Sequence, residues 1–125
     1  HTTDFPLKDI IDLVLQVRAE AYCIEAANPR HEHEWRVWEE VKLPEGKILI
    51  PGVVAHTTNT VEHPELVAWR ITNFARLVGR ENVIAGTDCG FSQGAFNPRV
   101  HPSIMWAKLR ALSEGAQLAT KQLWS

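Results

Sequence analysis

Hydrophobic residues follow two different spacings along the chain. In three segments they recur every three or four positions, as in a helix that buries one face. In three others they form short, nearly unbroken runs, as in parallel strands covered on both faces. The helical segments are 3–19, 63–79 and 101–123, and the strand-like runs are 21–27, 47–54 and 82–88. The segment 31–41 predicts one more short helix.

Proline and glycine residues mark the expected ends of these elements. Thr3 or Asp4 is a candidate N-cap for the first helix, whose apolar face is expected at Ile10, Leu13, Val14 and Val17. Pro64 and Gly79 mark the start and end of the next long helix. His101-Pro102 opens the last helix, where a stripe is expected at Met105, Leu109, Leu112, Ala116, Ala119 and Leu123. Pro51-Gly52 predicts a bulge or bend inside the second strand.

The order of elements predicts an α/β fold with a parallel sheet. One helix is followed by about three strand–helix units, which implies right-handed crossovers. Three parallel strands alone would leave both edges open, and a complete (β/α)8 barrel needs about 250 residues. We therefore expect residues 1–125 to form one partial domain, the C-terminal part of a TIM barrel.

Composition narrows the classes of function. The formal net charge is -2 and the basic residues are scattered, so neither a nucleic acid nor an anionic membrane is an expected partner. The apolar runs are too short to span a bilayer. Two cysteines do not make a disulfide framework and are more typical of free thiols or metal ligands. The sequence thus indicates a soluble, cytoplasmic protein.

Polar residues gather after each strand, where active sites of parallel α/β proteins form. Glu25 ends the first strand, His56 follows the second, and Asp88 and Cys89 end the third. A carboxylate in an apolar strand is costly unless it is paired or bound to a metal. The pattern therefore favours a site at this end of the sheet, with Glu25 and Cys89 as candidate ligands.

Each of these residues also has a plain structural interpretation. Glu25 could face a helix terminus or a buried arginine, and Cys89 could pack as a small hydrophobic residue. Cys23 points to the same side as Glu25 and could line the barrel interior beneath the site, but core packing is the favoured interpretation for it. His31-x-His33 resembles a metal pair, but its charged surroundings favour a surface or capping role.

Three segments resemble one known family. "CIEAANPRHEHE", "GVVAHTTNTVEHPELVAWRI" and "ENVIAGTDCGF…HPSIMWAKLRALSEGAQLA" are similar to the C-terminal catalytic barrel of cobalamin-independent methionine synthase. They look closest to its single-barrel relatives, which include the epoxyalkane:coenzyme M transferases. The resemblance implies a zinc-dependent enzyme on a (β/α)8 barrel that transfers a methyl or alkyl group to a thiol, such as homocysteine.

The resemblance also implies roles for residues of this chain. In the family, a His-x-Cys pair, a glutamate and a later cysteine hold zinc, and Glu25 and Cys89 match the last two. The His-x-Cys pair is expected upstream of His1, so this chain would need the remaining barrel portion or self-association. His56 is expected to relay a proton from the incoming thiol, and Asp88 to orient a neighbouring group. Thr57 stands where the family has a proton-shuttling histidine, and Ala55 where an aspartate is common, which leaves the acceptor thiol and the donor open.

Two other functions are also compatible with the sequence. The chain could be a non-catalytic half-barrel that assembles with itself or with a partner chain. It could also be a metal-independent barrel enzyme of the same broader superfamily, such as a decarboxylase relative. Zinc content, native mass and the metal dependence of any activity distinguish the three.

Overall fold

The computed structural model describes residues 4–91 and 100–125 of the chain. In chain order the elements are α1 (Leu7–Val14), β1 (Ala21–Ile24), η1 (Glu34–Glu39), β2 (Ile48–Val54), α2 (Pro64–Val78), η2 (Arg80–Asn82), β3 (Gly86–Thr87) and α3 (Pro102–Trp124). The elements labelled η are 3₁₀ helices. This order of a helix followed by strand–helix units confirms the predicted α/β fold.

The three strands form one parallel sheet in the order β1-β2-β3. β1 pairs with β2 from Ala21 opposite Ile48 to Ile24 opposite Pro51. Pairing of β2 with β3 shifts in register between Gly52 and Val54, which confirms the irregularity predicted at Pro51-Gly52. All three carboxyl ends therefore lie at one edge of the sheet.

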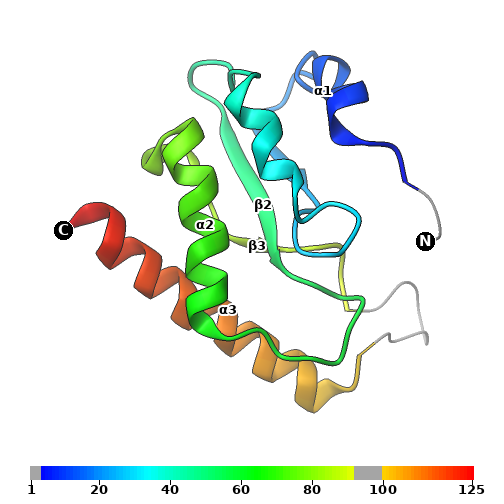
Figure 1. Cartoon of the computed structure of the whole chain (residues 1–125), viewed down its shortest axis with the longest axis vertical. Helices are drawn as coiled ribbons and strands as arrows, with labels where there is room; N and C mark the ends of the chain where they lie inside the picture. Colours follow the sequence, from blue (N-terminus) through cyan, green and yellow to red (C-terminus); the bar gives the residue numbers. More distant parts are fainter. Residues whose placement is uncertain (1–3, 92–99) are drawn as a thin grey trace.

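Two hydrophobic clusters join the helices to the sheet. In the first, α1, β1, η1 and α2 pack around Leu49 and Phe74. In the second, α2 and α3, which lie side by side in Figure 1, pack against Val53 and Val54 of β2. Gly115 lets α3 approach α2 closely, because a Cβ there would lie 2.4 Å from Val67.

The opposite side of the sheet carries exposed apolar residues. In β1 the side chain of Tyr22 is buried, whereas its neighbour Cys23 is exposed. The side chain of Ile84, just before β3, is 55% exposed. Core packing, the favoured interpretation of Cys23, is therefore wrong for this chain, because only one face of the short strand is covered by helices.

The ends of the two long helices agree with the sequence. α2 begins at Pro64, and the His63 side chain caps it by accepting a hydrogen bond from the backbone N–H of Glu65. It ends at Gly79, whose φ of 100° favours glycine. His101 caps α3 in the same way by accepting from Ser103.

The first helix differs from its prediction. Pro6, not Asp4, is its N-cap residue, and Thr3 lies outside the described residues. The buried positions are Leu7 and Ile11, while Leu13 and Val17 are exposed. The helix ends at Val14, so Val17 lies beyond it. Glu34 of η1 accepts a hydrogen bond from the N–H of Leu7 and so joins the start of the helix to η1.

Two further elements depart from the sequence pattern. The last strand is reduced to Gly86–Thr87, preceded by a single parallel bridge between Leu49 and Val83. The most deeply buried side of α3 is also not the expected stripe. It consists of Lys108, Ala111, Gly115 and Ala119. Small residues are buried there because α3 packs closely against α2.

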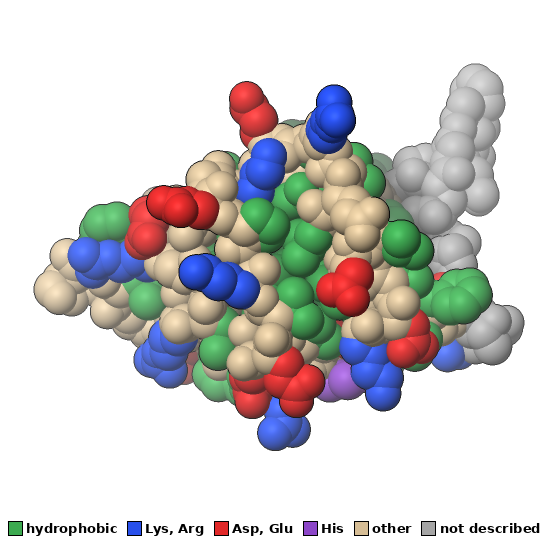
Figure 2. Space-filling model, turned by 90° about the horizontal axis from the view of Figure 1, so that it is seen from above, with side chains coloured by type: hydrophobic (Ala, Val, Ile, Leu, Met, Phe, Trp, Pro, Cys, Tyr) green, Lys and Arg blue, Asp and Glu red, His purple; other side chains and the backbone are tan. Residues whose placement is uncertain are grey.

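The surface carries charges of both signs. Figure 2 shows acidic and basic side chains interspersed on the face seen from above, with hydrophobic side chains between them. Within residues 4–91 and 100–125, none of the helices combines the length and the apolar character that crossing a bilayer requires.

Candidate metal centre

Each of the three strands delivers one possible metal ligand at its carboxyl end. Glu25 is the residue after β1, His56 is the second residue after β2, and Cys89 is the second after β3. One ligand atom from each side chain lies within 4.8 Å of those of the other two. We call these three residues the donor cluster. The structure thus brings together the two predicted ligands and adds His56 to them.

The carboxylate of Glu25 and the thiol of Cys89 are in direct contact. The thiol donates a hydrogen bond to Oε1 of Glu25, with 3.0 Å between sulfur and oxygen. This hydrogen bond, aided by partial burial and by the charges of Glu25 and Asp88, raises the pKa of Cys89 to about 11. Without a cation, the sulfur therefore keeps its proton at neutral pH.

His56 is the buried member of the donor cluster. Its side chain is only 2% exposed, and its Nδ1 has no hydrogen-bond partner among the described residues. Burial of an unpaired ring nitrogen is unfavourable. The sequence interpretation gave this residue a role in proton transfer, whereas its position also suits a metal ligand.

Asp88 lies beneath the donor cluster and accepts hydrogen bonds from the loop that follows Glu25. It is 1% exposed and binds the backbone N–H groups of Ala26 and Ala27 and the side-chain amide of Asn28, at 2.8 to 3.2 Å. Gly52 of β2 makes room for it, since a Cβ there would lie 2.0 Å from its carboxylate. Burial raises the pKa of Asp88, although these hydrogen bonds oppose the shift. The contacts make Asp88 a positioning residue for this loop.

A second polar group adjoins Glu25 on the side away from Cys89. His31 Nε2 lies 3.2 Å from Asp4 and 3.8 Å from Oε2 of Glu25, and its Nδ1 is bonded to Glu34. Burial lowers the pKa of His31, but the hydrogen bonds and charges of these carboxylates outweigh it, so the net shift is upward. The His31-x-His33 pair was predicted to have a surface or capping role. His33 is exposed, as predicted, but its side chain does not cap η1, and the side chain of His31 is only 12% exposed.

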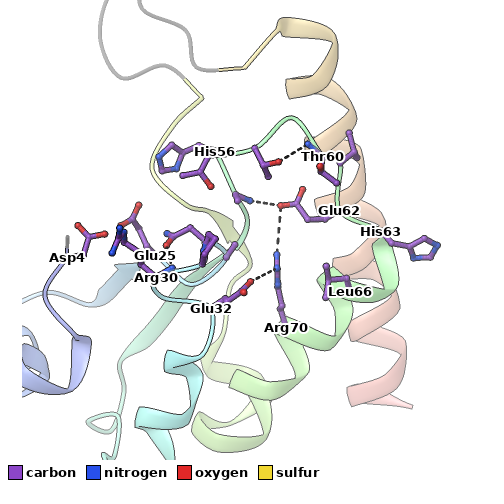
Figure 3. A pocket seen from close by; sticks show the side chains of 17 residues that line it. Asp4, Glu25, Arg30, Glu32, His56, Thr60, Glu62, His63, Leu66 and Arg70 are labelled. Carbon is purple, nitrogen blue, oxygen red and sulfur yellow. Dashed lines mark hydrogen bonds and ion pairs between the residues drawn. The ribbon is translucent and has the colours of Figure 1, made fainter. Parts of the chain in front are cut away.

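An open cavity of about 870 Å³ is lined by Glu25 and His56 of the donor cluster and by the loop after β2. Figure 3 shows Glu25 and His56 at one part of this cavity, and Glu62 and Arg70 at another. Thr57 and Thr58 of the loop after β2 also line it, as do Asn28 and Arg30 of the loop after β1. The cavity offers room for a small molecule next to the donor cluster.

A second buried cluster beside the cavity holds the loop that carries His56. Glu62 accepts a hydrogen bond from the backbone N–H of Ala55 at 2.6 Å and pairs with Lys108 at 2.9 Å. Lys108 also donates to the carbonyl of Thr60, and Arg70 lies 3.9 Å from Glu62. We call Glu62, Arg70 and Lys108 the lysine cluster. The sequence interpretation missed it, although the spacing of Lys108 from Ala111, Gly115 and Ala119 was a possible signal.

The donor set fits zinc. Thiolate, imidazole and carboxylate are its usual protein ligands, with bonds of about 2.3 Å to sulfur and about 2.0 Å to nitrogen or oxygen. Two such bonds at a tetrahedral angle separate sulfur and oxygen by about 3.5 Å. Glu25 and Cys89, now 3.0 Å apart, would have to separate by only about half an ångström.

The comparison with solved structures finds a similar protein, whereas the two sequence comparisons find none. The chain is similar to a B12-independent methionine synthase from Shewanella sp. W3-18-1, solved in complex with selenomethionine. The TM-score is 0.75 and the identity 22%, over 93% of this chain and 31% of that protein. No protein-family model matches the chain, and no curated protein matches it. The likeness shows the fold, that of a part of such an enzyme's barrel, and the chain spans about a third of its length.

Proposed function

We propose that this chain contributes to a zinc-dependent enzyme that transfers a methyl or alkyl group to a thiol, of the methionine synthase type. The observation that carries the proposal is the contact of Glu25 with Cys89 at the carboxyl edge of the sheet. These two residues were predicted as ligands from the sequence, and the fold brings them together although they are 64 positions apart in the chain. The shared fold with a B12-independent methionine synthase supports the same reaction class.

In this reaction the acceptor loses the proton of its thiol, and its sulfur forms a bond to the alkyl carbon. The bond between that carbon and the donor breaks, and the donor leaves with the electron pair of that bond. A zinc ion bound at the site would lower the pKa of the acceptor thiol, so that a thiolate is available at neutral pH. Homocysteine is the acceptor of the family that the chain resembles, and other small thiols remain candidates.

The residues of this chain would prepare the site for that step. Glu25 and Cys89 would hold the metal, and Cys89 must release its proton to do so, which makes metal binding depend on pH. Asp88 fixes the loop that carries Glu25 through the N–H groups of Ala26 and Ala27. The cavity lined by Thr57 and Thr58 would hold the substrates beside the metal. Holding two reactants in position can lower a bimolecular barrier by about 7–11 kcal/mol.

The proposed barrel needs more strands than the three of this chain. The chain spans 31% of the methionine synthase that it matches, and the sheet leaves Cys23 and Ile84 exposed. We propose that the rest of a barrel, from further sequence or from another chain, covers this face and adds a His-x-Cys pair. We also propose that the protein acts in the cytoplasm, where both free cysteines would stay reduced.

Metal analysis and a transfer assay test the proposal. We expect the assembled protein to contain about one tightly bound zinc per barrel and to methylate homocysteine or another small thiol. The variant Cys89→Ala should lose both the zinc and the activity, whereas the matched control Cys23→Ala should keep the zinc. Full zinc content in Cys89→Ala would contradict the proposal.

The exposed side of the sheet also favours a second candidate, a non-catalytic half-barrel that pairs with itself or with a partner chain. Apolar side chains such as Ile84, 55% exposed, would be covered in such an assembly. Native mass spectrometry combined with metal analysis distinguishes the two candidates. Metal-free dimers would support the half-barrel, and a zinc-containing complex would support the enzyme.

A further inference from the structure

We infer that His56 is a third metal ligand, so that Glu25, His56 and Cys89 form a three-donor site within this one chain. The inference rests on the proposed function and extends its metal site. The resemblance assigns two ligands to this chain and expects the others upstream. The geometry adds the imidazole to the two ligands of this chain, from the strand that lies between their strands.

The imidazole ring of His56 lies close to both other donors. Its ligand nitrogen lies within 4.8 Å of both the Glu25 carboxylate and the Cys89 sulfur. A tetrahedral zinc site separates neighbouring ligand atoms by about 3.3–3.8 Å, given bonds of about 2.0–2.3 Å. Small side-chain rotations would therefore bring all three donors to one ion. Three ligands from this chain alone leave one tetrahedral position, which a substrate or a ligand from the rest of the barrel would take.

One nitrogen of the His56 ring is buried without a hydrogen-bond partner among the described residues. His56 is 2% exposed, yet its Nδ1 contacts no hydrogen-bond partner in the described part of the chain. Trp38 Nε1 and Asn73 Nδ2 are also buried and unpaired, but both are N–H donors without a lone pair for a metal ion, whereas a neutral imidazole has one. A cation bound at Nδ1 would give this nitrogen a partner and remove part of the energetic cost of burying it.

A buried hydrogen bond holds the backbone next to His56. The residue before it, Ala55, donates its N–H to Glu62 at 2.6 Å, and Glu62 is held by Lys108 at 2.9 Å. Ligand sites need such supporting contacts to hold the donors in place. Asp88 gives the same support to the loop after Glu25. Two of the three donors are therefore fixed by buried carboxylates.

Cobalt(II) titration of the whole chain, at neutral pH and with no other metal present, tests the inference. We expect one cobalt per chain, with visible d–d absorption and a thiolate-to-cobalt charge-transfer band. His56→Ala should weaken cobalt binding by at least about 100-fold, because losing even an outer-shell partner of a metal costs 10–100-fold. The matched control His33→Ala, at an exposed position, should bind as the wild type does.

A second variant keeps the test decisive if His56→Ala fails to fold, which circular dichroism would reveal. His56→Cys replaces one zinc-type ligand by another, so it should still bind cobalt, and a second thiolate should strengthen the charge-transfer band. Unchanged affinity in His56→Ala, an unchanged band in cobalt-bound His56→Cys, or no cobalt binding by the wild type would each overturn the inference.

The outcome is separable from that of the proposed function. If cobalt binding requires His56 but the assembled zinc protein alkylates none of the thiols tested, the third ligand stands and the proposed activity fails. If His56→Ala binds cobalt as tightly as the wild type while the assembled protein transfers methyl groups, the activity stands and the third ligand fails.

Discussion

The donor cluster and the lysine cluster adjoin the same cavity, but their charges are balanced in different ways. Glu62 of the lysine cluster faces Lys108 at 2.9 Å and Arg70 at 3.9 Å, so its charge has two cationic partners. Glu25 of the donor cluster faces a neutral thiol and shares His31 with two other carboxylates, Asp4 and Glu34. Among the described residues, the cationic partner of Glu25 is thus a histidine that two other carboxylates also contact.

This difference separates a structural polar cluster from a candidate site. Buried charges are tolerated when partners neutralise them, as in the lysine cluster. In the donor cluster, an unpaired ring nitrogen, a protonated thiol and a carboxylate whose cationic partner is a shared histidine lie close together. A divalent cation would satisfy all three. The predictions below test whether the lysine cluster is structural and whether the groups around Glu25 act as its support.

The largest expected effect is the loss of Lys108. This side chain is fully buried, and Lys108→Met would leave Glu62 with only the more distant Arg70 as a cationic partner. Breaking a buried ion pair costs about 3–5 kcal/mol of unfolding free energy. We expect a loss of about 3 kcal/mol in urea denaturation, because Arg70 compensates in part.

Two further variants control this measurement. Lys121→Met, at an exposed position of the same helix, should change the unfolding free energy by less than about 0.5 kcal/mol. The double variant Glu62→Gln/Lys108→Met should be more stable than Lys108→Met, because no unpaired charge stays buried. A loss below about 1 kcal/mol in Lys108→Met would show that the pair adds nothing beyond an exposed salt bridge.

The second largest loss of stability is expected at Asp88, whose carboxylate holds the loop after Glu25. Asp88→Ala removes the acceptor of two backbone N–H groups and of the Asn28 amide. Leaving buried donors unpaired costs about 1–3 kcal/mol, and the loop that carries Glu25 should loosen. We therefore expect lower stability in urea denaturation with a chelator present, and weaker cobalt binding.

Asp12→Ala is the matched control for Asp88→Ala, since Asp12 is exposed on α1. It should leave both stability and cobalt binding unchanged. If Asp88→Ala lost stability but bound cobalt normally, Asp88 would support the fold without positioning the ligands.

The parts of the fold that follow from local pattern were predictable. The spacing of apolar residues, with Pro64 and Gly79 at the ends, was sufficient to predict α2, and His101-Pro102 to predict the start of α3. The first helix was less predictable, because its apolar residues continue beyond its end. Leu13 and Val17 match a helical face in sequence, but the helix stops at Val14 and both are exposed.

The candidate site was predictable where it depends on strand ends. Glu25 and Cys89 follow their strands directly, and parallel strands bring such positions together. The partners of the Asp88 carboxylate could not be foreseen, because two of the three are backbone N–H groups, which look alike in every sequence. Lys108 was missed for a related reason, since a lysine in a helix usually faces solvent and its burial depends on a carboxylate 46 positions earlier.

The smallest expected effect is the pH dependence that His31 gives to the metal-free chain. Its pKa in the folded state lies above the ordinary value of 6.5, because the carboxylates of Glu34, Asp4 and Glu25 outweigh the effect of burial. The folded chain then holds the proton more tightly than the unfolded chain does. The resulting stability is fully present below pH 6.5 and is lost as the pH rises through the raised pKa. Urea denaturation with a chelator at several pH values measures it. His31→Asn should flatten the profile between pH 6.5 and the raised pKa, and the exposed His33→Asn should not. An unchanged profile in His31→Asn would mean that the carboxylates around Glu25 are not balanced by this ring, and would deepen the contrast with Glu62.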